Sequence, residues 1–275
     1  YLGVAFLDVQ HHIASDPAEA AGLALAAGVD VELPGVHCYG QPLLNAVRSG
    51  VVPESLVNRA ATRVLRQKCE LGMLDPDWTP EAAIHGTAAP DGTVDLDPPQ
   101  SRALARELAE ESVVLLANDG TLPLAPTARL AVVGPLADDS DAMLGCYSFP
   151  RHVLSHHPEL PIGLEIPTLL EALRDELPAA TVEHVRGCTV DGSDTAGIAA
   201  AAQAAARAEV CLVVLGDRAG LFGRGTSGEG CDREDLHLPG VQSDLLEAVL
   251  ATGTPTVLVM FSGRPYALGA YAGRL

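Results

Sequence analysis

Hydrophobic and polar positions follow a regular pattern over the second half of the chain. Short apolar runs predict strands at residues 130–133, 181–185, 210–215 and 256–261. Apolar residues at helical spacing predict helices between them, at residues 168–177, 195–206 and 241–250. Strands that alternate with helices favour a mostly parallel sheet covered by helices on both faces. We therefore expect an α/β fold here.

The first 74 residues carry helical signals with one strand between them. Asp16, Pro17 and Glu19 form a typical helix start, which predicts a helix that runs to about Ala27 and ends at Gly28. Residues 29–33 read as a short strand. Further helices are expected at residues 42–49 and 53–70, the second ended by a glycine. This is material of the β/α type.

The composition changes between residues 75 and 100, where proline, glycine, threonine and aspartate dominate. Such a stretch is typical of a linker. We place the domain boundary there, with the first unit at 1–74, a linker at 75–99 and the second unit at 100–275. A helix is expected at residues 101–111, followed by the apolar run 113–116.

One carboxylate stands out in the second unit. Glu229 lies between Gly228 and Gly230 on a polar stretch that follows the apolar run 210–215. Functional loops of open α/β sheets leave the carboxyl ends of such strands. We expect a mobile, glycine-rich loop from which Glu229 reaches a neighbouring cavity without being held in a structural ion pair with Arg224 or Arg233. A solvated loop acid is the alternative.

The same loop contains a nucleotide-like pattern. Residues 223–228 fit G-x-G-x-x-G, but the dinucleotide fingerprint needs its glycines directly after a strand and at the start of a helix. Here the glycines begin seven residues after Gly216, and the charged segment that follows does not resemble an apolar helix. We therefore keep a nucleotide-binding α/β domain only as the second hypothesis. Under the first hypothesis no cofactor is expected.

Charge and cysteine content narrow the partners. A formal net charge of -19 disfavours nucleic acid and anionic membranes, because no basic run offsets it. No apolar run is long enough to span a membrane. Six cysteines without a C-x-x-C pair favour a reducing, cytoplasmic location. The chain starts at Tyr1 without methionine, so the absence of a signal sequence leaves secretion open, and a homo-oligomer is also open.

Histidines and acidic clusters do not make a convincing metal site. The histidines at positions 11, 12, 37, 152, 156 and 157 have no cysteine at ligand spacing, and the 152–157 segment, where two of them stand four residues apart, reads as a surface loop. Residues 138–141 are acidic enough for calcium but lack the glycine and distal glutamate of a dedicated loop. We expect no metal and interpret that segment as a solvated turn. In the same way, Asp232 and Arg233 are interpreted as residues that shape the charged loop.

Several segments together resemble a known family. They are residues 27–34, 63–72, 112–124 and 226–230, with 232–233, 238–240 and 263–266. In this order and spacing the chain resembles the two-domain glycoside hydrolases of family 3, the β-glucosidase and β-xylosidase group. The resemblance implies a (β/α) barrel, a linker and an α/β sandwich, with the active site between the domains. Residues 1–74 would then be the last part of the barrel, and the sandwich would be incomplete at its C-terminal end.

The resemblance also implies site residues. Glu229 matches the acid/base glutamate of the β-glucosidase type, and Tyr1 matches an aromatic residue next to the nucleophile that lines the sugar site. The nucleophilic aspartate itself is expected just upstream of Tyr1. A retaining glycosidase needs both carboxyl groups, about 5 Å apart.

The expected activity is that of a retaining exo-β-glycosidase that removes terminal glucose or xylose from oligosaccharides or aryl glycosides. The fragment alone is expected to be inactive. A non-catalytic remnant that binds sugar weakly is the third hypothesis. The preference between glucose and xylose is not decided by these residues, because most of the barrel that would choose between them lies upstream.

Overall fold

The computed structural model describes residues 2–80, 95, 97–154 and 156–275. The chain divides into two compact units, Tyr1–Asp95 and Leu96–Leu275, and each is described here by itself. Most of the expected linker, residues 81–94 and 96, lies outside the described residues.

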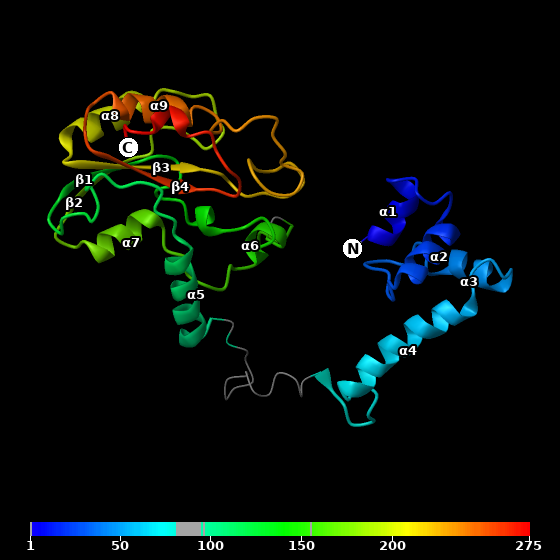
Figure 1. Cartoon of the computed structure of the whole chain (residues 1–275). Coiled ribbons are helices and arrows are strands. Elements are labelled where there is room, and N and C mark those ends of the chain that lie inside the picture. The colour runs from blue at the N-terminus through cyan, green and yellow to red at the C-terminus, as the bar shows by residue number, and fades with distance from the viewer. Residues whose placement is uncertain (1, 81–94, 96, 155) are drawn as a thin grey trace. The chain divides into compact units, whose positions relative to one another are not determined.

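The first unit is helical in the part that the structure describes. Its helices are α1 (Gly3–Val9), α2 (Pro17–Ala27), α3 (Gln41–Arg48) and α4 (Glu54–Glu70) (Figure 1). The start of α2 is as predicted: the Asp16 side chain accepts a hydrogen bond from the Glu19 amide at 2.9 Å. Gly28 ends the helix in the left-handed conformation, also as predicted. Small buried residues of α2, such as Ala20, Ala21 and Ala24, let the neighbouring helices pack closely.

The predicted strand at residues 29–33 is wrong, because this segment has no strand to pair with in the described part of the unit. Its polar groups are satisfied in other ways. The Leu33 carbonyl accepts from the Leu2 amide at 2.7 Å, and the Val29 carbonyl accepts from the Tyr39 hydroxyl. The Glu32 carboxylate accepts from three successive backbone amides at residues 37–39, which folds the segment into a turn.

The second unit contains a four-stranded parallel sheet in the order β2-β1-β3-β4, which confirms the predicted parallel arrangement. Its strands are β1 (Arg129–Val133), β2 (Thr181–Val185), β3 (Val210–Gly216) and β4 (Thr256–Phe261). Every strand lies within one residue of its predicted bounds. The helices α7 (Leu169–Glu176), α8 (Ile198–Arg207) and α9 (Gln242–Leu250) connect them.

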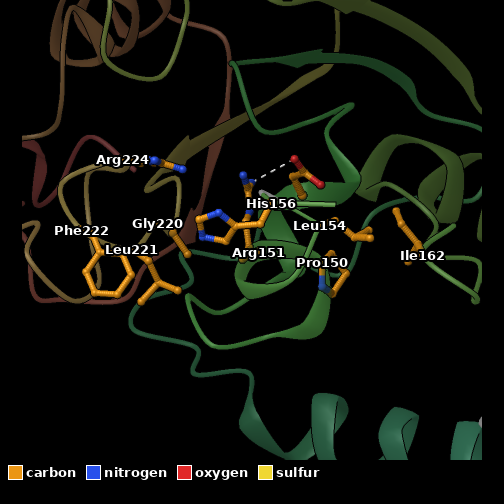
Figure 2. A pocket seen from close by; sticks show the side chains of 11 residues that line it. Pro150, Arg151, Leu154, His156, Ile162, Gly220, Leu221, Phe222 and Arg224 are labelled. Carbon is orange, nitrogen blue, oxygen red and sulfur yellow. Dashed lines mark ion pairs between the residues drawn. The ribbon is translucent and has the colours of Figure 1, made fainter. Parts of the chain in front are cut away.

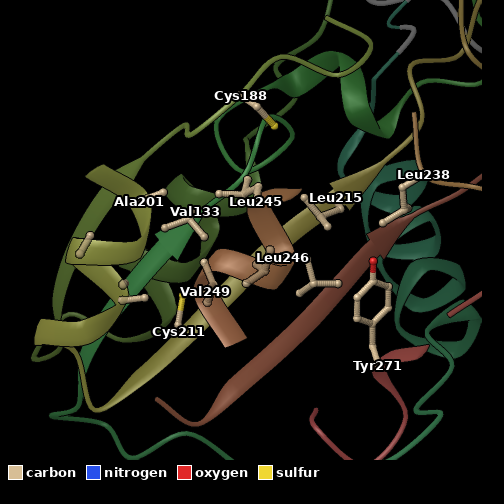
Figure 3. Packing of buried hydrophobic residues seen from close by; sticks show 14 residues of the cluster. Val133, Cys188, Ala201, Cys211, Leu215, Leu238, Leu245, Leu246, Val249 and Tyr271 are labelled. Atoms are coloured by element: carbon tan, nitrogen blue, oxygen red, sulfur yellow. The ribbon is translucent and has the colours of Figure 1, made fainter. Parts of the chain in front are cut away.

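Helices cover both faces of this sheet. Side chains of β3 alternate between two apolar clusters: Cys211, Val213 and Leu215 pack under α8 and α9, whereas Leu212 and Val214 pack on the side of α7. Figure 1 shows α8 and α9 on one side of the strands and α7 on the other. Figure 3 shows the first cluster from close by. Because β3 is buried on both faces, its carboxyl end is a fixed point for the loop that follows.

Before the sheet lies α5 (Pro99–Ser112), which covers the predicted helix at residues 101–111. None of its residues is buried. The apolar run that follows is also exposed, with Val113, Val114, Leu115 and Leu116 each between 65% and 83% accessible. This segment therefore adds nothing to the core of the described chain.

A buried glutamine fixes the end of β3. The Gln242 side chain is fully buried at the start of α9. Its Oε1 accepts from the Gly216 amide at 2.8 Å, and its Nε2 donates to the carbonyls of Gly216 at 2.9 Å and Val190 at 2.7 Å. The amide group thus ties the last residue of β3 to the helix and to the loop after β2.

We expect Gln242→Leu to destabilise the second unit by at least about 2 kcal/mol. The substitution leaves buried backbone groups without hydrogen-bond partners, which costs about 1–3 kcal/mol for each group. Urea denaturation followed by pulsed hydrogen exchange of peptides from β3 measures the change. Gln203→Leu, on the exposed face of α8, is the matched control and should be nearly neutral. Equal stability of the two variants would contradict the account.

Candidate active site

The loop between β3 and α9 carries Glu229, at the carboxyl end of a parallel strand as predicted. The Glu229 side chain is exposed, and its backbone carbonyl accepts from the Phe222 amide at 2.8 Å. The Gly220 amide donates to the Ser227 carbonyl at 3.0 Å. The loop is therefore folded back on itself, with residues 219–222 lying beside residues 227–229.

A buried carboxylate, that of Asp217, anchors this fold. It directly follows β3 and accepts hydrogen bonds from the Thr226 hydroxyl at 2.9 Å, the Gly263 amide at 3.1 Å and the Tyr266 hydroxyl. The Arg218 amide donates to the Thr226 hydroxyl at 2.9 Å, and the Thr226 amide donates to the Arg218 carbonyl at 2.9 Å. The beginning and the middle of the loop are thereby joined to each other and to the chain after β4.

The phenol of Tyr266 is kept as a donor to this carboxylate. Burial, together with the hydrogen bond to Asp217, raises the pKa of Tyr266 to about 12. The Arg264 guanidinium lies 4.9 Å from the centre of the Tyr266 ring, in a cation–π arrangement. The hydroxyl therefore stays protonated at any physiological pH.

The glycines of the loop serve close packing of its two layers. A Cβ at Gly225 would lie 2.6 Å from the Arg218 carbonyl oxygen. Gly228 has a φ of +115°, and a Cβ there would lie 2.2 Å from the Gly220 carbonyl oxygen. Side chains at either position would force the two layers of the loop apart. The glycines flanking Glu229 thus belong to a loop held by backbone hydrogen bonds.

Glu229 has a partner that the sequence did not indicate. The Tyr147 hydroxyl, 82 residues away, donates a hydrogen bond to its Oε2. Tyr147 precedes the short helix α6 (Phe149–His152), and its ring packs edge-on against that of His152 at 5.6 Å. Within the described chain, Oε1 has no hydrogen-bond partner. Among the described residues, no ion pair joins Glu229 to Arg224 or Arg233.

The remaining predicted residues are not brought to this carboxylate. Asp232 and Arg233 are exposed, and their side chains make no hydrogen bond or ion pair within the described residues, so no contact supports their expected part in shaping the loop. Asp217 and Thr226 do that instead. Tyr1 lies outside the described residues.

A cavity of about 350 Å³ lies beside the loop. It is lined by loop residues 219–222 and Arg224 and by residues from the segment 141–162, among them Arg151 and His156 (Figure 2). The Arg151 Nη2 atom lies 3.0 Å from Asp141 Oδ2. Apolar side chains complete the lining, so the cavity combines apolar surface with charged groups.

The structure gives little support to the cofactor alternatives. The glycine motif at residues 223–228 is followed by irregular chain, and the next helix begins only at Gln242. Residues 140–143 form a short 3-10 helix capped by Asp139, as expected of a turn. Among the residues that the structure describes, no group of three or more histidine, cysteine or acidic side chains could hold a metal ion. No described helix is long and apolar enough to cross a membrane.

The fold and the loop define an α/β domain with a parallel sheet. The loop after the inner strand β3 presents the Glu229 carboxylate, which Tyr147 binds. The profile of the glycosyl hydrolase family 3 C-terminal domain matches residues 113–273. The chain belongs to glycosyl hydrolase family 3.

Curated relatives and solved structures agree with this assignment. The chain is 34% identical over 254 residues to a probable exo-1,4-β-xylosidase of Neosartorya fischeri, covering 92% of this chain and 29% of that protein. It is 30% identical to a periplasmic β-glucosidase of Salmonella typhimurium, covering 94% of this chain and 34% of the relative. A β-glucosidase structure from Listeria innocua matches with a TM-score of 0.79 and 29% identity, over 100% of this chain and 34% of that one. The chain thus spans about a third of the length of these relatives.

Several of the similar structures were solved with ligands. A mutant of the Listeria innocua β-glucosidase was solved in complex with laminaribiose, with a TM-score of 0.78 and 29% identity over 98% of this chain and 34% of that one. An exo-β-xylosidase solved with a xylobiose aziridine probe has a TM-score of 0.74 at 24% identity, over 99% of this chain and 32% of that one, which is a likeness of fold.

We expect Asp217→Ala to loosen the loop that carries Glu229. Hydrogen bonds to charged groups contribute about 1.5–3 kcal/mol, so amide exchange at Gly220 and Phe222 should accelerate at least about tenfold. Hydrogen exchange followed by NMR measures this directly. Asp232→Ala removes an exposed acid from the same loop and should leave the exchange rates unchanged. Similar rates in both variants would show that Asp217 does not hold the loop.

Proposed function

We propose that this chain contributes the acid/base residue of a retaining exo-β-glycosidase, which hydrolyses terminal non-reducing β-D-glucosyl or β-D-xylosyl residues. The observation that carries the proposal is Glu229, a carboxylate on a hydrogen-bonded loop beyond β3 in a family 3 C-terminal domain. One of its oxygens is bound by Tyr147, and the other has no partner among the described residues. The folded loop and the Tyr147 donor support a functional role for this carboxylate over that of a solvated loop acid.

The chemistry requires a second carboxylate. In the proposed reaction the nucleophile, an aspartate expected just upstream of Tyr1, attacks the anomeric carbon while protonated Glu229 gives its proton to the departing glycosidic oxygen. Glu229 is then ionised and takes a proton from the water that attacks the glycosyl-enzyme. Each turnover returns both carboxyl groups to their starting state.

The arrangement around Glu229 suits this double role. Tyr147 donates to Oε2, which fixes the plane of the carboxyl group and leaves Oε1 available for the proton that moves. The loop beneath it is anchored by Asp217, so the group does not have to be ordered in each catalytic cycle. Catalytic groups held in place in this way lose less free energy to positioning.

The first unit enters the proposal as the last part of a (β/α) barrel that bears the nucleophile and the sugar site, with Tyr1 lining that site. Glucose and xylose both remain candidate sugars, in oligosaccharides or aryl β-glycosides. The six cysteines all have free thiols, four of them buried, which supports the cytoplasmic location that we propose. Asp232 and Arg233 remain proposed only as neighbours of the acid on its loop.

The 275-residue chain should show no glycosidase activity, since Glu229 supplies an acid without a nucleophile. Assays with aryl β-glucoside and aryl β-xyloside, run beside a form extended upstream to include the expected aspartate, measure this. We expect turnover only by the extended form. Turnover by the shorter chain would contradict the proposal that the nucleophile lies upstream of Tyr1. Inactivity of both forms would favour a non-catalytic remnant.

In the extended form, Glu229→Ala should slow glycosides with poor leaving groups about 10²- to 10⁴-fold and activated aryl glycosides far less, because a good leaving group needs little protonation. Added azide should restore part of the rate by attacking the glycosyl-enzyme. Glu234→Ala, an exposed acid of the same loop, is the control and should behave as the parent. If Glu229→Ala leaves all substrates equally fast and azide has no effect, the acid/base lies elsewhere, with Asp232 examined first.

A further inference from the structure

The cavity beside the Glu229 loop carries an excess of positive charge in a strongly acidic protein. The chain has a formal net charge of -19, yet the cavity is lined by two arginines, Arg151 and Arg224, against one acid, Asp141. His156 adds a further nitrogen donor. Local charge of this sign, against the charge of the whole molecule, attracts an anion.

The two arginines are unequally engaged. Arg151 is mostly buried: its Nη2 lies 3.0 Å from Asp141 Oδ2, and both its Nη2 and its Nε are covered by protein atoms, without a hydrogen-bond partner in the described chain. Arg224 is exposed and forms no ion pair with the described residues. An anion in the cavity would therefore be bound by the exposed Arg224, with the charge of Arg151 nearby. Guanidinium groups bind carboxylates well because of their fork of donors.

The rest of the lining is apolar and suits a flat, unsaturated body. Pro150, Leu154, Ile162, Leu221 and Phe222 contribute hydrocarbon surface, as Figure 2 shows. Phe222 is 66% exposed and has a φ of +53°, so its large ring is displayed at the surface by a backbone conformation that such residues seldom adopt. The volume of about 350 Å³ lies at the lower end of the range of about 300–1,000 Å³ for ligand sites.

Both segments that line the cavity also contact Glu229. The Phe222 amide donates to the Glu229 carbonyl, so the loop wall is bonded to the acid itself. Tyr147, which donates to the Glu229 carboxylate, is followed within a few residues by Pro150 and Arg151 of α6. The cavity therefore adjoins the two segments that hold Glu229, and Glu229 itself is not among the lining residues.

We propose that this cavity receives the leaving group of the substrate and selects leaving groups that carry a carboxylate on an aromatic ring, the chemistry of a phenolic acid glycoside. The ring lies against Phe222 and the aliphatic side chains, and the carboxylate binds Arg224 beside the positive charge of Arg151. The placement as a leaving-group site rests on the proposed function of Glu229. The preference for an aryl carboxylate rests on the cavity alone.

Binding to the 275-residue chain tests the cavity without any catalysis. In calorimetric titrations we expect 4-hydroxybenzoate to bind at least about tenfold more tightly than the uncharged 4-hydroxybenzamide, since a charge-assisted hydrogen bond contributes more than about 1.4 kcal/mol. Glucuronate, a carboxylate without an aromatic ring, should bind more weakly than 4-hydroxybenzoate. Arg224→Gln should remove most of the difference between acid and amide, whereas Arg233→Gln, an exposed arginine outside the lining, should leave it intact.

Two results would overturn the proposal: equal binding of acid and amide by the parent chain, or the same loss in Arg224→Gln and Arg233→Gln. Tighter binding of glucuronate would show a site for sugar acids and would also overturn the aryl assignment. NMR shifts confined to Phe222 and its neighbours should accompany binding, and shifts elsewhere would place the ligand outside this cavity.

Kinetics of the extended form separate this inference from the proposed function. The substrates are 4-carboxyphenyl and 4-carbamoylphenyl glycosides, both β-D-glucosides and β-D-xylosides. For each sugar, the kcat/KM of the carboxyphenyl glycoside is divided by that of the carbamoylphenyl glycoside. This ratio should fall about tenfold or more in Arg224→Gln and should not change in Arg233→Gln. If both substrates are hydrolysed at an unchanged ratio, the leaving-group preference fails and the glycosidase function stands. If neither is hydrolysed, the function fails, and the titrations still decide what the cavity binds.

Discussion

The hydrogen bonds of the buried Asp217 carboxylate hold the candidate site together. A buried charge must be paired or fully hydrogen-bonded, and this one finds donors in three places: Thr226 in the loop, and Gly263 and Tyr266 in the chain after β4. The described arrangement of the loop satisfies all of them. Because Asp217 directly follows β3, the loop is positioned by the rigid centre of the sheet.

This constraint explains why the loop needs its glycines. Two layers of backbone lie close enough to exchange hydrogen bonds, and a Cβ at Gly225 or Gly228 would collide with a carbonyl oxygen of the opposite layer. The result is a carboxylate on a loop that is exposed at its tip and ordered at its base. Tyr147 then orients the carboxyl group from a separate segment, so that sheet, loop and α6 all contribute to one side chain.

Much of the sheet could be predicted from the sequence, because a strand buried on both faces, such as β3, is an uninterrupted apolar run. The predicted strand at residues 29–33 failed because periodicity cannot report whether a pairing partner exists nearby. Glu229 and its position after β3 followed from glycine spacing and sheet topology. Tyr147 could not be predicted, because a contact across 82 residues leaves no local signal. Asp217, a polar residue at the end of a buried strand, carried a signal that was overlooked.

The most direct test of the central claim is a crystal structure of the form extended upstream, with a sugar-like inhibitor bound. The account predicts that the Glu229 carboxyl group lies about 5–5.5 Å from that of the expected nucleophilic aspartate, the separation of a retaining glycosidase. It also predicts that Tyr147 still donates to Glu229. A separation of about 6.5–9.5 Å would indicate inversion, and a Glu229 remote from the inhibitor would contradict the assignment of this residue as the acid/base.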